Sequence, residues 1–242
     1  MSNAIRVLEL LLHQTSQIVQ NLYRHLGNGD SMTPERNPEF FDRWAADYDW
    51  FVEGWANSFP FEGYDKLLDR IVELADPQPG MKILDMGIGT GNLAERFIGT
   101  GCEVWGIDFS GNMLEEARRK MPSAHLLQAD ILAEWPSELK TGFDRIVSAY
   151  VFHHFNLETK LKVIERILNE LLRDNGRIII GDTSYPSFAA RANARKELID
   201  VWDDTEFYWA ADEIKLMSWG NSAHIVYEQI SSCGGVYLIV PA

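Results

Sequence analysis

Short apolar runs of strand length alternate with segments of helical spacing through most of this 242-residue chain. Apolar strands that alternate with helices form a parallel sheet that is covered on both faces. The last two apolar runs, residues 224–230 and 236–240, are too close in sequence for a parallel return, so we expect them to pair antiparallel. The alternation predicts a doubly wound α/β fold whose seven-stranded, mostly parallel sheet ends in an antiparallel strand.

The chain divides into an N-terminal arm and one α/β domain. Residues 5–26 carry apolar side chains on one broad helical face. We expect residues 1–39 to form a helical arm and linker, and residues 40–242 to form the domain. The arm would pack on the domain or on a second copy of the chain as a homodimer, and membrane association is the less favoured alternative. Within the domain we expect strands at 82–86, 103–107, 125–128, 143–149 and 177–181, and helices at 64–75, 92–98, 113–120 and 157–171.

Composition narrows the class of partner. The formal net charge is −14, with 22 basic and 36 acidic residues, which argues against a nucleic-acid substrate because phosphate contacts need Lys and Arg. No run approaches the roughly 20 apolar residues of a membrane helix. Two cysteines, Cys102 and Cys233, are too few for a disulfide framework or a Cys-rich metal site. We therefore expect a cytoplasmic protein with neither nucleic acid nor membrane as a partner.

Three alternate glycines, Gly87, Gly89 and Gly91, follow Asp85 at the end of the first expected strand. Glycine lets the backbone turn sharply and approach a ligand without a β-carbon in the way. The helix expected next would add free N–H groups and the positive end of its dipole. A plain tight loop is the alternative, but an acid before three alternate glycines favours a nucleotide site.

Two further acids stand at strand ends. Asp108 ends the second strand, where its carboxylate could accept both hydroxyls of a ribose or simply cap the next helix, for which Ser110 is the better residue. Asp130 follows the third strand and could accept a hydrogen bond from an adenine amino group. With Asp85, these acids fall along one crevice at the carboxyl edge of the sheet, where open α/β sheets bind ligands.

In these motifs the chain resembles the class I S-adenosylmethionine-dependent methyltransferases, over about residues 40–240. Asp85 and the glycines match the first motif of that family, residues 106–110 its ribose motif and residues 129–130 its adenine motif. The resemblance implies a Rossmann-like methyltransferase fold, S-adenosylmethionine as methyl donor and S-adenosylhomocysteine as product. It also implies cofactor contacts from residues in and beside the motifs: Ile88, Phe109, Met113, Ile131 and Ser148.

Residues 41–49 are similar to the lead-in of small bacterial methyltransferases of the ubiquinone/menaquinone-methylase-like type. This resemblance implies that Tyr48 closes over the cofactor. Trp44 and Tyr48 are four residues apart, so on one helix they would share a face. We expect this segment to be a lid over the site.

Gly89 to Ala94 also satisfies the dinucleotide pattern Gly-x-Gly-x-x-Ala, which would indicate an NAD-dependent oxidoreductase. Three features disfavour NAD: Asp85 and Gly87 precede the pattern at methyltransferase spacing, Asp130 has no role in a dinucleotide site, and the antiparallel ending fits badly. A non-catalytic S-adenosylmethionine-binding module and a nucleic-acid or protein methylase are further alternatives. We favour methyl transfer to a small molecule.

The acceptor side is indicated by His153 and His154, which follow the fourth strand. Histidine titrates near neutrality, so either could take a proton from an acceptor, or one could only cap or pack the loop. No acid or cysteine at ligand spacing accompanies the pair, so we expect no metal. The acidic and aromatic residues 202–209 would form either a lid over the acceptor or a helix that packs on the core.

Overall fold

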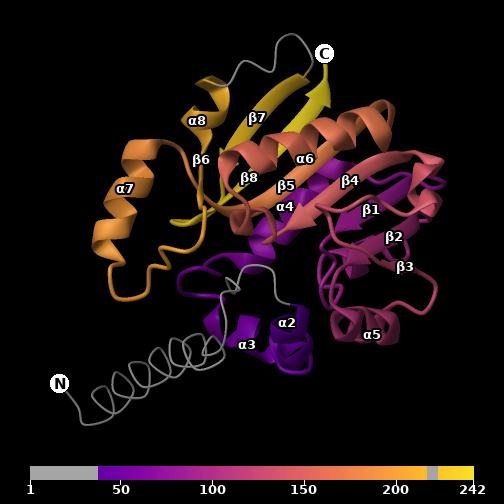
Figure 1. The fold of residues 1–242 in the computed structure, drawn as a ribbon, viewed down its shortest axis with the longest axis horizontal. Helices are drawn as coiled ribbons and strands as arrows, with labels where there is room; N and C mark the ends of the chain where they lie inside the picture. The colour runs from indigo at the N-terminus through magenta and orange to yellow at the C-terminus, as the bar shows by residue number, and fades with distance from the viewer. Residues whose placement is uncertain (1–37, 217–222) are drawn as a thin grey trace.

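The computed structural model describes residues 38–216 and 223–242. One sheet has the strand order β3-β2-β1-β4-β5-β8-β7, in which the first five strands are parallel and β8 is antiparallel to both β5 and β7 (Figure 1). The predicted fold class and the antiparallel ending are confirmed. The strands are β1 (Lys82–Met86), β2 (Glu103–Asp108), β3 (His125–Gln128), β4 (Phe143–Ala149), β5 (Leu172–Tyr185), β7 (Ala223–Gln229) and β8 (Gly234–Pro241).

The sheet has one more strand than the sequence predicted. The two residues of β6 (Trp209–Ala210) pair with the end of β5, which makes eight strands in the part of the chain that the structure describes. β5 is also longer than expected at both ends. Near its start the register with β4 jumps from Leu172 to Arg177, and Asn175 has a φ of 63°. The residues expected to separate helix from strand are thus a bulge within β5, because the strand pairs on both sides of it.

Alternate residues of the strands feed two cores, one on each face. In β5, Ile179 packs on the face covered by α4 (Tyr64–Ala75) and α5 (Gly111–Lys120), whereas Ile178 and Ile180 pack on the face covered by α6 (Leu157–Glu170). Figure 1 shows α6 in front of the sheet and α4 behind it. A central strand with both faces buried is apolar throughout, which is why these runs could be recognised as strands.

The segment after the glycines is the clearest difference from expectation. Instead of a helix over 92–98, only the single 3₁₀ turn η2 (Ala94–Phe97) forms, and Ile98 is already extended, with φ −64° and ψ 134°. The glycine-rich turn therefore has no long helix behind it. The amides of Gly87 and Ile88 donate to the carbonyl of Ile107, so hydrogen bonds to β2 hold the turn in place of a following helix.

Two short helices, α2 (Pro38–Trp44) and α3 (Tyr48–Trp55), lie at the carboxyl edge of the strands beside α5 (Figure 1). The expectation that Trp44 and Tyr48 share one helix is wrong, since a turn at residues 45–47 separates the two helices. Their rings nevertheless meet edge to face, with centroids 5.0 Å apart. The expected arm helix at 5–26 lies outside the described residues, which contain no helix long and apolar enough to cross a membrane.

Beyond the carboxyl end of β5 the chain forms α7 (Phe188–Glu197), the strand β6 and α8 (Ala211–Leu216). Two short 3₁₀ helices, η3 (Ser137–Thr141) and η4 (Phe152–His154), precede β5 in the chain. Residues 202–208 form neither the expected helix nor a strand. The Trp202 ring packs 4.7 Å from that of the buried Tyr208, whereas Phe207 is 41% exposed.

Candidate active site

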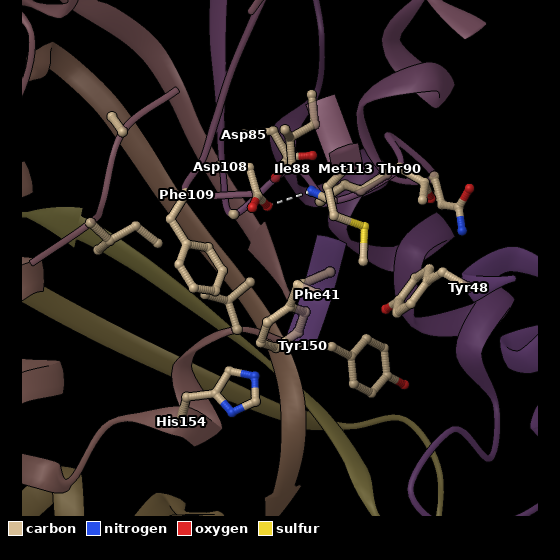
Figure 2. Close-up of a pocket in the computed structure, with 18 of the residues that line it drawn as sticks. Phe41, Tyr48, Asp85, Ile88, Thr90, Asp108, Phe109, Met113, Tyr150 and His154 are labelled. Atoms are coloured by element: carbon tan, nitrogen blue, oxygen red, sulfur yellow. Dashed lines mark hydrogen bonds between the residues drawn. The ribbon is translucent and has the colours of Figure 1, made fainter. Parts of the chain in front are cut away.

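A cavity opens where the sheet order changes direction between β1 and β4, at the carboxyl ends of the strands. Loops from both strands, from β2 and β3, and the helices α2 and α3 contribute to its walls (Figure 2). Most of the cofactor residues expected from the sequence line it: Tyr48, Asp85, Gly87, Ile88, Gly89, Asp108, Phe109, Met113, Asp130 and Ile131, together with His154.

Three of the expected residues do not line the cavity. Gly91 faces inward, where a β-carbon would lie 2.4 Å from Met121 Cε, and its φ of 90° is in the left-handed region that favours glycine. Ser148 is buried and its hydroxyl donates to the carbonyl of Met86 at 2.7 Å, which joins β4 to β1. His153 lies behind His154. The structure thus gives Gly91 and Ser148 a place beneath the cavity floor rather than in its surface.

Asp85 is the most unusual group in the cavity wall. It is 2% exposed, and neither carboxylate oxygen has a hydrogen-bond partner of good geometry among the residues that the structure describes. Burial, and then repulsion from Asp108, raise the pKa of Asp85 to about 8, and the backbone amide of Ala94 opposes this only in part. A buried polar group without a partner is costly, so this arrangement favours a cationic or hydrogen-bond-donating ligand at this point.

Asp108 organises the glycine turn. One of its oxygens accepts from the Gly89 amide and the other from the Ser110 amide, both at 2.9 Å. Burial raises the pKa of Asp108 to about 6, and these amides limit the rise. Gly89 has a φ of 54° and no atom within 4 Å of the position of a β-carbon, so its backbone is exposed to the cavity. Figure 2 shows the bond between Asp108 and this turn at the same end as Asp85.

Hydrogen bonds hold α2 and α3, the two lead-in helices, against the cavity. On α2, Asp42 Oδ1 accepts from the Ser110 hydroxyl at 2.5 Å and from the Asn112 amide at 3.1 Å. Phe41 and Tyr48 thereby reach the cavity wall, and the Phe41 ring lies 5.2 Å from that of Phe109.

On α3, Asp49 provides the second anchor. Its carboxylate accepts from Thr90 Oγ1 at 2.6 Å, from Asn92 Nδ2 at 3.0 Å and from Lys120 Nζ at 2.5 Å. Burial alone would raise the pKa of Asp49, but these three partners outweigh it and the pKa lies below its ordinary value. The anchor joins α3 both to the glycine turn and to the end of α5.

The far end of the cavity is aromatic. His154 lies there, opposite Asp85 and Asp108, and the Phe41 ring stands between it and Tyr150 (Figure 2). The Phe41 and His154 rings are perpendicular, with centroids 5.8 Å apart. The cavity therefore has an acidic end at the glycine turn and an apolar end that carries one imidazole.

Beside His154 is a polar cluster that sequence reasoning did not find, in which Asp182 is buried and His153, His154 and Glu206 are half-buried. His153 Nδ1 is 2.6 Å from Asp182 Oδ1, and His154 Nδ1 is 3.1 Å from Glu206 Oε2. Burial alone would raise the pKa of Glu206, but the two histidines lower it to about 2. No acid accompanies the histidine pair at ligand spacing in the sequence, but the fold brings Asp182 and Glu206 to it. Asp182 follows the apolar centre of β5 and Glu206 lies in the acidic segment 202–209, but no local spacing connects either acid to the histidines.

Comparison with known proteins decides the family. The chain matches a methyltransferase domain over residues 83–176. It is 35% identical to an uncharacterized methyltransferase of Oceanobacillus iheyensis over 165 residues, which are 66% of this chain and 74% of that protein. A relative from Anoxybacillus flavithermus is 33% identical over 177 residues, or 69% of this chain and 79% of the relative. The chain belongs to this methyltransferase family.

Solved structures agree on the fold of this methyltransferase. A complex of DhpI with SAM and HEP has a TM-score of 0.63 at 15% identity and covers 84% of this chain and 95% of its own. A TehB-like SAM-dependent methyltransferase from Corynebacterium glutamicum has a TM-score of 0.55 at 20% identity, and the match covers 85% of this chain and 100% of that protein. The protein is a class I S-adenosylmethionine-dependent methyltransferase, and the NAD-dependent alternative is set aside.

Proposed function

We propose that this methyltransferase methylates a small molecule whose reactive atom enters the cavity at its His154 end. The observation that carries the proposal is the cover formed by α2 and α3, which is hydrogen bonded to the glycine turn and to α5 through Asp42 and Asp49. An acceptor under this cover must be small, since the chain of a nucleic acid or a folded protein would have to displace it. The net charge of −14 further disfavours nucleic acid.

The residues at the acidic end fit S-adenosylmethionine. When bound, it supplies an activated methyl carbon on a positively charged sulfur. We assign to Asp85 the binding of a positively charged or N–H-donating part of this molecule, because its buried carboxylate has no partner of good geometry among the described residues. Each oxygen of Asp108 accepts one backbone N–H and keeps a lone pair for a ribose hydroxyl, and Asp130 at the end of β3 would receive the adenine.

Positioning and exclusion of water are the main contributions that we assign to the protein. In-line transfer needs the acceptor atom, the methyl carbon and the sulfur to be aligned, and alignment supplies a large share of such a rate enhancement. Phe41, Tyr48 and Phe109 would keep water out of the cavity. His154 would contact the acceptor, while His153, held by Asp182, supports it from behind.

The test is a labelling experiment with the full chain and methyl-labelled S-adenosylmethionine. We expect label in the low-molecular-mass fraction of a bacterial extract and none in its nucleic-acid or protein fractions. Asp108→Ala, which removes the proposed ribose contact, should abolish most of the labelling at low cofactor concentration. Label confined to nucleic acid or protein would contradict the proposed acceptor class, and no label in any fraction would contradict the proposed transfer.

A further inference from the structure

His153, His154 and Glu206 converge in the wall between two cavities. His154 lines the cofactor cavity, whereas Glu206 lines a second cavity that also contains Lys160 and Arg191. One ligand-type atom from each of the three residues lies within 4.8 Å of the other two. Glu206 Oε2 is 3.1 Å from His154 Nδ1 and 3.9 Å from His153 Nε2.

The second nitrogen of His153 is oriented by a buried carboxylate. Asp182 is completely buried and accepts the Trp209 indole N–H at 3.0 Å and the His153 backbone amide at 2.8 Å, which fix its position. Because a carboxylate only accepts, the His153 proton belongs on Nδ1, at 2.6 Å from Asp182 Oδ1. The Nε2 lone pair is then directed to the side on which Glu206 lies. A carboxylate behind a histidine in this way is the usual outer partner of a metal-binding imidazole.

We propose that His153 Nε2, His154 Nδ1 and Glu206 Oε2 bind one divalent first-row transition ion, of the zinc class. Two imidazoles and one carboxylate form a three-ligand set that zinc uses where a fourth position is left open for water or substrate. Imidazole favours zinc, cobalt or nickel over magnesium and calcium, which prefer oxygen. Since His154 also lines the cofactor cavity, the open position would face the end assigned above to the acceptor.

The charges around the three ligands favour a cation. Among the described residues, the charges that act most on His153 are two carboxylates, Asp182 and Glu206, and one ammonium, that of Lys160. The Lys160 ammonium donates to the carbonyl of Phe207 and lies 4.5 Å from the centre of the Trp209 ring, so it is already held by other groups. Arg191, in the same second cavity, is paired with Glu213 through two bonds of 2.6 and 2.8 Å. With neutral imidazoles the ligand set and Asp182 keep a net negative charge that a divalent ion would neutralise.

The test uses Co²⁺ as a spectroscopic probe on the full chain. We expect one equivalent to produce the visible absorption bands of four- or five-coordinate cobalt, and Zn²⁺ to remove them by competition. His154→Gln and Glu206→Gln should each abolish these bands. His125→Gln is the matched control, because His125 Nε2 also lies near a carboxylate, 3.6 Å from that of Glu103. Both of these side chains are substantially exposed, and they lie at the starts of β3 and β2. It should bind Co²⁺ as the unaltered chain does.

Absence of cobalt binding would overturn the proposal. Cobalt bands that survive in both His154→Gln and Glu206→Gln would also overturn it, because the ion would then bind elsewhere in the chain.

X-ray absorption of the Zn²⁺-loaded protein needs no variant. We expect two imidazoles and oxygen, but no sulfur, as ligands of the ion. Scattering from a sulfur ligand would overturn the proposal.

Ion binding and methyl transfer can fail separately. Calorimetry with S-adenosylhomocysteine should give similar affinity in Glu206→Gln and in the unaltered chain, because Glu206 lines only the second cavity, and this binding also shows that the variant is folded. The direction of the open position rests on the proposed function, whereas the three ligands do not. A protein that labels no small molecule but binds cobalt through these residues would contradict only the function.

Discussion

At the scale of single residues, the site is defined by acids that are buried before any ligand arrives. Asp85 has no partner of good geometry among the described residues, and Asp108 has two backbone amides. The two carboxylates therefore differ in what they contribute: Asp108 holds the glycine turn in shape, and Asp85 raises the free energy of the unliganded site. Each difference leads to a measurable effect.

Asp108→Ala should weaken both the fold and the binding of S-adenosylhomocysteine. Loss of hydrogen bonds to a charged acceptor costs about 1.5–3 kcal/mol, which lowers affinity by roughly tenfold to a hundredfold. Asp144→Ala is the matched control, since Asp144 also accepts a backbone amide, that of Lys82 at 2.7 Å, but lies at the opposite edge of the sheet. Calorimetry should show unaltered affinity in this control. Equal losses of affinity in both variants would indicate that Asp108 acts only through stability.

Asp85→Asn should stabilise the unliganded protein by an amount that grows with pH. The folded pKa of Asp85, about 8, is above its ordinary value of 3.8, so between these values the folded state holds a proton that the unfolded state has released. Stability then falls as pH rises through this window, by about 1.4 kcal/mol per pH unit for one such group. The variant lacks this titration. Urea unfolding of both proteins from pH 5 to pH 9 measures the difference between their free energies of unfolding, in which the contributions of the other titrating groups cancel. If this difference does not change with pH, the pKa of Asp85 is not raised.

At the scale of elements, the lead-in helices are the part most separable from the rest. Besides the polar contacts through Asp42 and Asp49, α3 fully buries only Val52 in the core, whereas α4, α5 and α6 each bury an apolar face of several residues against the sheet. Elements with few buried apolar contacts open at the lowest free energy. Since Phe41 of α2 and Tyr48 of α3 line the cavity, we expect entry of the cofactor to involve such an opening.

Hydrogen exchange over residues 38–55 should slow markedly when S-adenosylhomocysteine is added. The ligand would add contacts with Phe41 and Tyr48 and so raise the free energy of local opening. Residues 157–170 of α6 cover the other face of the sheet and serve as the internal control, whose exchange should change little. Asp49→Asn removes the charge that Lys120 pairs with and should speed exchange in α3 without ligand. Equal protection with and without ligand would mean that the two helices are permanently docked.

The elements also show how far the sequence could be interpreted. Ile83, Ile107, Val147 and Ile179 lie in apolar runs bounded by turns, and these local patterns were sufficient for the parallel strands and for the crevice between them. The missing helix after the glycines, the break between Trp44 and Tyr48, and the pairing of β6 depend on tertiary contacts. The contact of Glu206 with the histidines also depends on tertiary structure, because the chain folds back beside β5 to bring Glu206 there. No spacing of residues in the sequence predicts this contact.

At the scale of the whole molecule, the net charge of −14 is the dominant long-range effect. Like charges repel across a compact surface and destabilise it, and the repulsion is screened by salt. Exposed ion pairs act in the opposite direction because salt weakens them, but each contributes only about 0–1 kcal/mol. Arg195 and Asp204, both more than half exposed at 2.8 Å, are of this kind. The sum of many weak repulsions should therefore exceed the loss of a few weak attractions.

We accordingly expect sodium chloride to raise the melting temperature at pH 7. Raising ionic strength from about 0.01 M to about 0.15 M shortens the screening length from roughly 30 Å to roughly 8 Å, which removes most repulsion between distant carboxylates but little of the attraction within a pair in contact. The control is the same titration near pH 4.8, the isoelectric point, where net repulsion vanishes and salt should have little effect or a slightly destabilising one. Thermal unfolding followed by circular dichroism measures both series. A melting temperature that falls with salt at pH 7 would contradict this expectation. It would mean that the ion pairs, including Asp49–Lys120, stabilise the fold by more than the repulsion between like charges destabilises it.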